Sequence, residues 1–203
     1  MSVDLGYFEG MYTANADPWG FSDRWYEHRK RQLTAAALPA RRYRSAYEPG
    51  CSIGMLSEIL ADRCESLLCG DAVEAAVRQA RERLASRTNV RIERQSLPAD
   101  WPDGSFDLVV LSEILYYFDD REFMVIVDRV RDGIIGGGDL VAVHWRRPVV
   151  EHVFTGDEVH RRLCDIDGLQ PRCHYQDEDF VLDVLTRTPP AVQSVAEAEG
   201  LWP

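Results

Sequence analysis

The sequence predicts a doubly wound α/β domain with a single, mostly parallel, seven-stranded sheet. Strand-like and helix-like hydrophobic periods alternate from 43 to 188, which is typical of βαβ units. The first expected strand ends in a glycine-containing turn that opens a helix. Two short alternating segments close the core and predict an antiparallel last strand pair. An aromatic, helical arm precedes this core.

Each element of the core has a local signal. The run 106–111 is continuously apolar, as expected for a central parallel strand that is covered on both faces. The helix 121–135 should end at the glycine run 136–138. Thr155 followed by Glu158 predicts a capped helix start. The expected strands are 43–48, 66–70, 89–94, 106–111, 140–145, 172–176 and 180–187, and further helices are expected over 55–64 and 73–86.

The chain divides into three expected parts. Residues 1–42 form the arm, which we expect either to pack over the sheet or to cover a ligand as a lid. Residues 43–188 form the core, and 189–203 form a mostly disordered tail, because Pro, Ala and Glu dominate there without periodicity. The aromatic residues of the arm are Tyr7, Phe8, Tyr12, Trp19, Phe21, Trp25 and Tyr26.

Composition excludes several function classes. The 203 residues carry a formal net charge of -11, so the basic surface that a nucleic-acid partner requires is not expected. The five cysteines form no C-x-x-C pair, which argues against a zinc site or any other metal site of this kind. No apolar run could span a membrane and no signal peptide is recognisable, so we expect a cytoplasmic protein without a membrane partner. The oligomeric state has no signal in the sequence.

The turn after the first strand predicts a nucleoside site. Glu48, Gly50 and Gly54 lie around the turn, and Asp71 ends the next strand about 20 residues later, the usual offset for such sites. Small residues let the backbone approach the ligand, and the acid accepts hydrogen bonds from the ribose hydroxyls. A dinucleotide fingerprint starting at Gly50 would require further glycines where Ser52 and Met55 stand. A nucleotide-dependent oxidoreductase is therefore disfavoured.

The pattern E-x-G-x-G-x-G fits this turn except at Ser52 and resembles the first motif of S-adenosylmethionine (SAM) methyltransferases. Over roughly 7–187 the chain resembles the NodS-type family of these enzymes. This resemblance implies a Rossmann-like class I methyltransferase fold, SAM as cofactor and S-adenosylhomocysteine (SAH) as product. The stretches that carry it are Tyr7-Phe8-Glu9-Gly10, Asp17-Pro18-Trp19-Gly20-Phe21, Trp25-Tyr26-Glu27-His28-Arg29-Lys30, Glu48-Pro49-Gly50-Cys51-Ser52-Ile53-Gly54, Leu97-Pro98-Ala99-Asp100-Trp101-Pro102, 106–113 and Val141-Ala142-Val143-His144-Trp145-Arg146.

The resemblance and the topology together assign candidate site residues. Ser96 and Leu97, after the third strand, should contact the adenine. Arg29 or Lys30 could pair with the SAM carboxylate, while Trp19 and Trp25 could cover the sulfonium. The expected cofactor-binding residues are Glu48, Gly50, Cys51, Ser52, Gly54, Asp71, Ser96, Leu97, Ser112, Trp19 and Arg29.

The methyl acceptor should lie at the ends of the fourth and fifth strands. Glu113 could bind or deprotonate a substrate ammonium, and His144 could act as a general base because histidine titrates near neutrality. Tyr116, Tyr117 and Trp145 are the expected walls of the acceptor site.

The resemblance implies a small-molecule or oligosaccharide acceptor. The family's namesake methylates the amino group of a deacetylated chitooligosaccharide, so an amine is favoured. Two alternatives remain open from the sequence. The protein could be a small-molecule O-methyltransferase, or it could bind SAM without transferring its methyl group.

Overall fold

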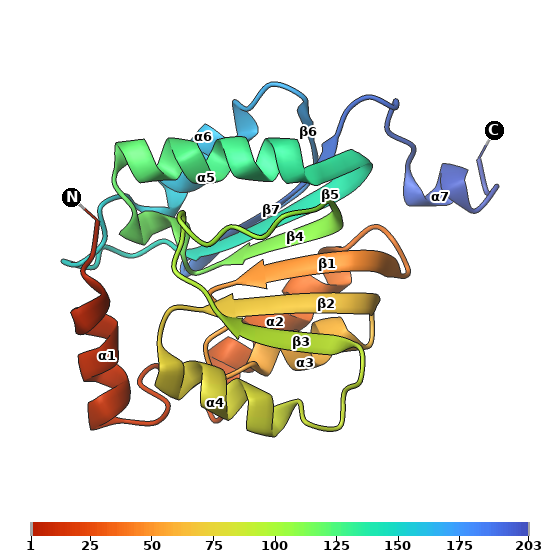
Figure 1. Cartoon of the computed structure of the whole chain (residues 1–203). Coiled ribbons are helices and arrows are strands. Elements are labelled where there is room, and N and C mark those ends of the chain that lie inside the picture. The colour runs from red at the N-terminus through yellow and green to blue at the C-terminus, as the bar shows by residue number, and fades with distance from the viewer. Residues whose placement is uncertain (1, 203) are drawn as a thin grey trace.

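The computed structural model describes residues 2–202 and contains a seven-stranded sheet with helices on both faces (Figure 1). The strand order is β3-β2-β1-β4-β5-β7-β6. The strands are β1 (Tyr43–Pro49), β2 (Cys64–Asp71), β3 (Val90–Arg94), β4 (Phe106–Ser112), β5 (Ile134–Trp145), β6 (Leu169–Gln176) and β7 (Phe180–Arg187). Strands β1 to β5 pair in parallel, whereas β7 is antiparallel to both β5 and β6. The predicted fold class is confirmed.

The helices form two layers around the sheet. Helices α5 and α6 cover one face, and α2, α3 and α4 cover the other (Figure 1). The bounds of these helices are α2 (Trp25–Ala37), α3 (Met55–Ala61), α4 (Glu74–Arg83), α5 (Asp120–Gly133) and α6 (Gly156–Cys164). Because both faces are covered, the side chains of Leu108, Val109, Val110 and Leu111 in β4 are fully buried.

The arm is helical, as expected. Helix α1 (Leu5–Ala14) stands beside the carboxyl ends of the parallel strands (Figure 1). It begins at Asp4, whose carboxylate accepts a hydrogen bond from the N–H of Gly6. The N–H of Val3 donates to the carbonyl oxygen of Tyr117 in the 3-10 helix η1 (Leu115–Tyr117), 2.9 Å away. The start of the arm is thereby joined to the segment that follows β4.

The glycine run 136–138 does not end a helix, so that prediction was wrong. Helix α5 ends at Gly133 and β5 begins at once with Ile134. The register of β4 and β5 shifts between the pairs Phe106–Ile134 and Leu108–Asp139. The glycines take up this irregularity inside the strand, and Gly137 has a φ of +82°.

The predicted helix start at Thr155 is confirmed. Thr155 caps α6, and a reciprocal capping box joins its side chain and backbone to Glu158. After β7 the chain leaves the sheet and forms a single exposed turn of helix, α7 (Val195–Ala198) (Figure 1). The part boundaries at 42/43 and 188/189 stay predictions. Among residues 2–202, no helix has the length and apolarity needed to cross a membrane.

Candidate active site

A cavity of about 1070 Å³ lies at the carboxyl ends of β1, β2 and β4 and beneath the arm. Open α/β sheets bind ligands at this edge, where the strand order reverses. Here the reversal falls between β1 and β4. Most of the residues predicted for the site line this cavity: Trp19, Glu48, Gly50, Cys51, Ser52, Asp71, Ser96, Leu97, Ser112, Glu113, Tyr116, Tyr117 and Trp145.

The glycine turn is held against β2 with its backbone along the cavity. Gly50 has a φ of +71°, which favours glycine, and a Cβ there would lie 2.7 Å from Cδ1 of Ile114, so any side chain would also have to displace Ile114. The N–H of Cys51 donates to the carbonyl oxygen of Gly70 at 2.9 Å. Ser52 also has a positive φ, of 52°, and its hydroxyl contacts the hydroxyl of Tyr12 in α1. The turn therefore links the sheet to the arm.

Asp71 stands at the end of β2 with its carboxylate at the cavity wall. One oxygen accepts a hydrogen bond from the N–H of Ser52 and the other from the N–H of Val73, both at 2.9 Å. Burial raises the pKa of Asp71 above its usual value, and these N–H donors oppose the rise. A carboxylate has about four acceptor positions, so the group can still accept a hydrogen bond from a neighbouring hydroxyl.

Glu48 and Cys51 form the buried floor beside the turn. Burial raises the pKa of Glu48 to about 7, although the hydroxyl of Ser57 in α3 donates to its carboxylate. A contact with Cys69 and burial raise the pKa of the Cys51 thiol well above its usual value. A buried thiol of this kind is a poor nucleophile, and Glu48 connects β1 to α3 through Ser57.

Ser96 and Leu97 line the cavity after β3, at the expected adenine position. The N–H of Ser96 donates to Asp100 at 2.9 Å, which orders this segment. Gln95 is buried, and its carboxamide lies between Tyr47 and Glu93, at 3.0 Å and 3.1 Å respectively. This end of the cavity therefore offers an apolar side chain, a serine hydroxyl and backbone groups.

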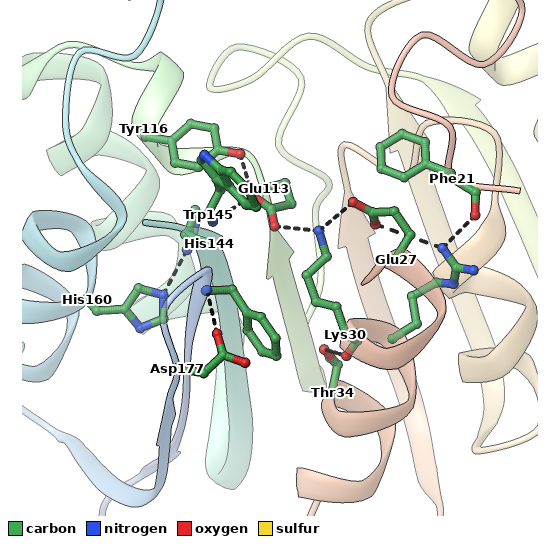
Figure 2. A network of polar contacts seen from close by, with 12 residues as sticks. Phe21, Glu27, Lys30, Thr34, Glu113, Tyr116, His144, Trp145, His160 and Asp177 are labelled. Atoms are coloured by element: carbon green, nitrogen blue, oxygen red, sulfur yellow. Dashed lines mark hydrogen bonds and ion pairs between the residues drawn. The ribbon is translucent and has the colours of Figure 1, made fainter. Parts of the chain in front are cut away.

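A network of charges around Glu113 forms the opposite end of the cavity (Figure 2). One carboxylate oxygen of Glu113 accepts from Nζ of Lys30 at 2.6 Å. The other accepts from the backbone N–H of Trp145 at 2.9 Å and from the hydroxyl of Tyr116. Glu113 has a φ of 56°, a conformation that non-glycine residues rarely adopt and that often marks functional sites. Three donors therefore fix this carboxylate in one orientation.

Lys30 lies between two carboxylates on the wall that α2 contributes (Figure 2). Its side chain is only 5% exposed, and Nζ is 3.1 Å from Glu27 as well as 2.6 Å from Glu113. Burial raises the pKa of Glu27, and Lys30 opposes the rise. Nζ also lies 4.8 Å from the ring centre of Tyr26, a favourable cation–π distance.

Arg29 does not reach the cavity, so its assignment to the cofactor is corrected. Its guanidinium pairs with Asp177 at 2.7 Å and with the hydroxyl of Tyr175. Each helical residue rotates the side-chain direction by about 100°, which turns Arg29 away while Lys30 and Arg31 line the cavity. Arg31 donates to the carbonyl oxygen of Phe21 at 3.0 Å.

His144 is also corrected, because its ring is completely buried behind the cavity wall. Nε2 accepts a hydrogen bond from the N–H of Leu115 at 3.2 Å, and Nδ1 lies 3.0 Å from Nε2 of His160 (Figure 2). His160 in turn contacts Asp183 at 2.6 Å. Burial and the neighbouring His160 lower the pKa of His144 well below its usual value. The ring therefore positions η1 and does not line the cavity.

Two further residues predicted to contact the cofactor, Gly54 and Trp25, do not line the cavity. Gly54 is the N-cap of α3 with a φ of +80°, and a Cβ there would lie 3.2 Å from Ala80 in α4. Its role is therefore close helix packing rather than contact with a ligand. Trp25 is 72% exposed and stacks on His28, whereas Trp19 lines the cavity beside Tyr12 and Phe21.

Sequence reasoning missed Arg24 and His152 and expected Tyr26 only as one of the aromatic residues of the arm, and all three line the cavity. The hydroxyl of Tyr26 is buried and has no hydrogen-bond partner within the described part of the chain. Arg24 and His152 also face the cavity. His152 lies in the loop between β5 and α6, where the sequence has no periodicity that could indicate its direction. Across residues 2–202, no group of His, Cys, Asp and Glu side chains is arranged to hold a metal ion.

Comparison with known proteins identifies similar sequences. The model of the family "Nodulation protein S (NodS)" matches residues 11–132. Nodulation protein S of Rhizobium tropici is 28% identical over 127 residues, which are 62% of this chain and 53% of the relative. The chain thus spans about half the length of the curated relatives it matches.

Solved structures extend the similarity over most of the chain. A crystal structure of a candidate methyltransferase from Pseudomonas syringae is 40% identical, with a TM-score of 0.73, and covers 81% of this chain and 100% of its own. N-methyltransferase NodS from Bradyrhizobium japonicum WM9, in complex with SAH, is 26% identical with a TM-score of 0.80. That match covers 89% of this chain and 97% of the NodS chain.

Proposed function

Because the chain belongs to the Nodulation protein S (NodS) family, we propose that it is a SAM-dependent methyltransferase that methylates the amine of a small acceptor. The observation that carries this proposal is the single cavity, which joins the glycine turn and Asp71 at one end to the Glu113 network at the other. One end fits a nucleoside, and the other is built for an acceptor.

The residues present fit SAM. Gly50 leaves room for close approach, Asp71 has lone pairs for the ribose hydroxyls, and Ser96 with Leu97 would contact the adenine. Arg29 does not line the cavity, so we assign Arg31, which does, to the SAM carboxylate in its place. When bound, SAM supplies an activated methyl group on a positively charged sulfur.

The charge of the cavity favours cationic ligands. Eight of the lining residues are acidic and three are basic. A sulfonium and a substrate ammonium are both cations, so this excess of carboxylates would concentrate them in the cavity. An amine acceptor is therefore favoured over a carboxylate acceptor.

For the acceptor we propose an amino sugar or a short oligosaccharide with one free amino group. The side chains of Tyr116, Tyr117 and Trp145 provide aromatic surface at the acceptor end of the cavity. Glu113 would orient the amino group through its fixed carboxylate, so that positioning would supply much of the acceleration of transfer. The cytoplasmic location expected from the sequence, and the expected absence of nucleic-acid and membrane partners, stay predictions.

Calorimetry with SAH and with NAD tests the cofactor assignment. The wild-type protein should bind SAH and give no heat with NAD. A protein that binds neither, or only NAD, would contradict the proposal. A protein that binds SAH but transfers no methyl group to amines or hydroxyls would match the alternative of a SAM-binding protein without transferase activity.

A further inference from the structure

His152 has an unusual position among the groups that line the acceptor end. Its imidazole stacks flat on Tyr116, with ring centres 3.7 Å apart and an angle of 15° between the planes. The ring of Tyr117 packs edge-on against the same imidazole, with ring centres 5.0 Å apart. The backbone holds this loop in place, because the N–H of Val153 donates to the carbonyl oxygen of Tyr116 at 2.8 Å. The ring is thus fixed beside the residue whose hydroxyl contacts Glu113.

Neither ring nitrogen of His152 has a hydrogen-bond partner among residues 2–202. The ring is half-buried and lines the cavity. A fixed imidazole that faces a ligand cavity with both nitrogens unpaired is available to exchange a proton with a ligand.

The neighbouring groups cannot take this role. Glu113 already accepts from Lys30, Tyr116 and Trp145, and His144 uses both ring nitrogens inside the core. Burial raises the pKa of the Tyr26 and Tyr116 hydroxyls, so both remain protonated near neutrality. His152 is the only histidine that lines the described cavity.

We propose that His152 is the general base that removes a proton from the acceptor's ammonium group, an inference that rests on the proposed amine methylation. A free ring nitrogen takes one proton from R–NH3⁺, and the electron pair of the broken N–H bond stays on the nitrogen as its lone pair. The products of this step are R–NH2 and a protonated His152. Because the ring is half-exposed, the proton then passes to solvent. Glu113 positions the nitrogen through its fixed carboxylate.

The charges around His152 set the pH range of this step. Burial lowers the pKa of His152, while Glu113 and the exposed Glu151 oppose that change. The other titratable groups that face the ring are Tyr116 and Tyr117 from η1 and the neutral His144 behind them. The base is therefore unprotonated at neutral pH, where a substrate amine still carries its proton.

The pH profile of methyl transfer to a chitooligosaccharide with one free amino group tests the assignment. At pH 6, His152→Asn should lower kcat/KM by about 10- to 100-fold, and the deficit should shrink as pH rises and the amine loses its proton unaided. SAH affinity should not change. His28→Asn is the matched control, because His28 is an exposed histidine outside the cavity, and it should behave as the wild type. Parallel pH profiles for wild type and His152→Asn would overturn the assignment.

Two readouts separate a base from a structural residue. Imidazole added to His152→Ala should restore part of the lost rate, which a packing defect would not allow. In the SAH-bound wild type, the ring proton signals of His152 should shift when the amino-sugar probe is added, and no shift would contradict contact. If the wild type itself bound no SAH or methylated no amine, the proposed function would fail, and the assignment with it. By contrast, an active wild type with an equally active His152→Asn would remove the assignment alone.

Discussion

The two ends of the cavity are built in different ways. At the end proposed for SAM, the glycine turn and the acid expected to bind the ribose come from one short stretch, Glu48 to Asp71, in which a turn and an acid follow adjacent strands. The acceptor end combines Lys30, Glu113, Trp145 and His152, which belong to segments far apart in the chain. Local chain geometry fixes the first end, whereas tertiary packing fixes the second. The two ends should therefore respond separately to mutation.

The largest effect should come from Lys30→Met at the acceptor end. Removing this cation leaves the carboxylates of Glu27 and Glu113 facing each other without a counter-charge. We therefore expect the free energy of unfolding to fall by about 3–5 kcal/mol. Arg29→Met is the matched control. The Arg29 side chain is 37% exposed in its pair with Asp177, so its loss should lower the free energy of unfolding much less than the loss of Lys30. Chemical denaturation of both variants checks this, and equal losses would contradict the importance of the buried network.

Asp71→Ala, at the end proposed for SAM, should lower cofactor affinity more than it lowers stability. We expect SAH affinity to fall about 100-fold, because two hydrogen bonds from ribose to an ionised group are lost. The loss of the N–H acceptors for Ser52 and Val73 should lower the unfolding free energy by only about 1–2 kcal/mol. Calorimetry with SAH, together with denaturation, measures both quantities. Unchanged affinity would show that the ribose does not contact Asp71.

His144 should make stability depend on pH. The folded-state pKa of His144 lies below that of the unfolded chain, so its contribution to stability is complete above about pH 6.5 and is lost as pH falls, by at most about 1.4 kcal/mol per unit. Glu48 acts in the opposite direction, because its pKa is raised to about 7 and its contribution is lost as pH rises. Because the two contributions oppose each other, the informative quantity is the difference in pH dependence of stability between the wild type and a His144 variant.

Denaturation of wild type and His144→Asn between pH 5 and 7 isolates this contribution. Relative to the wild type, the variant should lose less stability as the pH is lowered. His28→Asn should keep the wild-type pH dependence, because that histidine is exposed. If His144→Asn and the wild type changed in parallel, the buried neutral ring would not be responsible.

The smallest effect should come from Ser52→Gly, which restores the typical glycine of the motif. Glycine accommodates the φ of 52° without strain, but the contact between Ser52 and Tyr12 is lost. These contributions oppose each other, so the unfolding free energy should change by less than about 1 kcal/mol and SAH affinity by only a few-fold. A large loss of affinity would mean that the serine hydroxyl itself binds the cofactor.

The sequence predicted the features that depend on neighbouring residues. The glycine turn, Asp71, the Thr155 capping box and the antiparallel β6–β7 pair all follow from local spacing. Errors occurred where packing decided the outcome. His144 follows Val143 in a strand covered on both faces, so its ring points into the core although it lies near the site. No pattern in the sequence distinguishes this orientation from the opposite one.

Helix phase and loop direction account for the other differences. Arg29 and Lys30 are adjacent basic residues, and only the packing of α2 determines which of them lines the cavity. His152 lies in an irregular loop, where the sequence has no periodicity. The glycine run 136–138 resembles a helix end, but β4 pairs with residues on both sides of it and incorporates the run into β5.

Methyl transfer to an amine is the most direct test of the proposed function. The protein is incubated with SAM that carries an isotopically labelled methyl group and with a chitooligosaccharide that has one free amino group. The matching fully N-acetylated oligosaccharide is the control. The label should appear on the nitrogen of the first sugar and be absent from the second. Label on oxygen, or no transfer to either sugar by a protein that binds SAH, would contradict amine methylation.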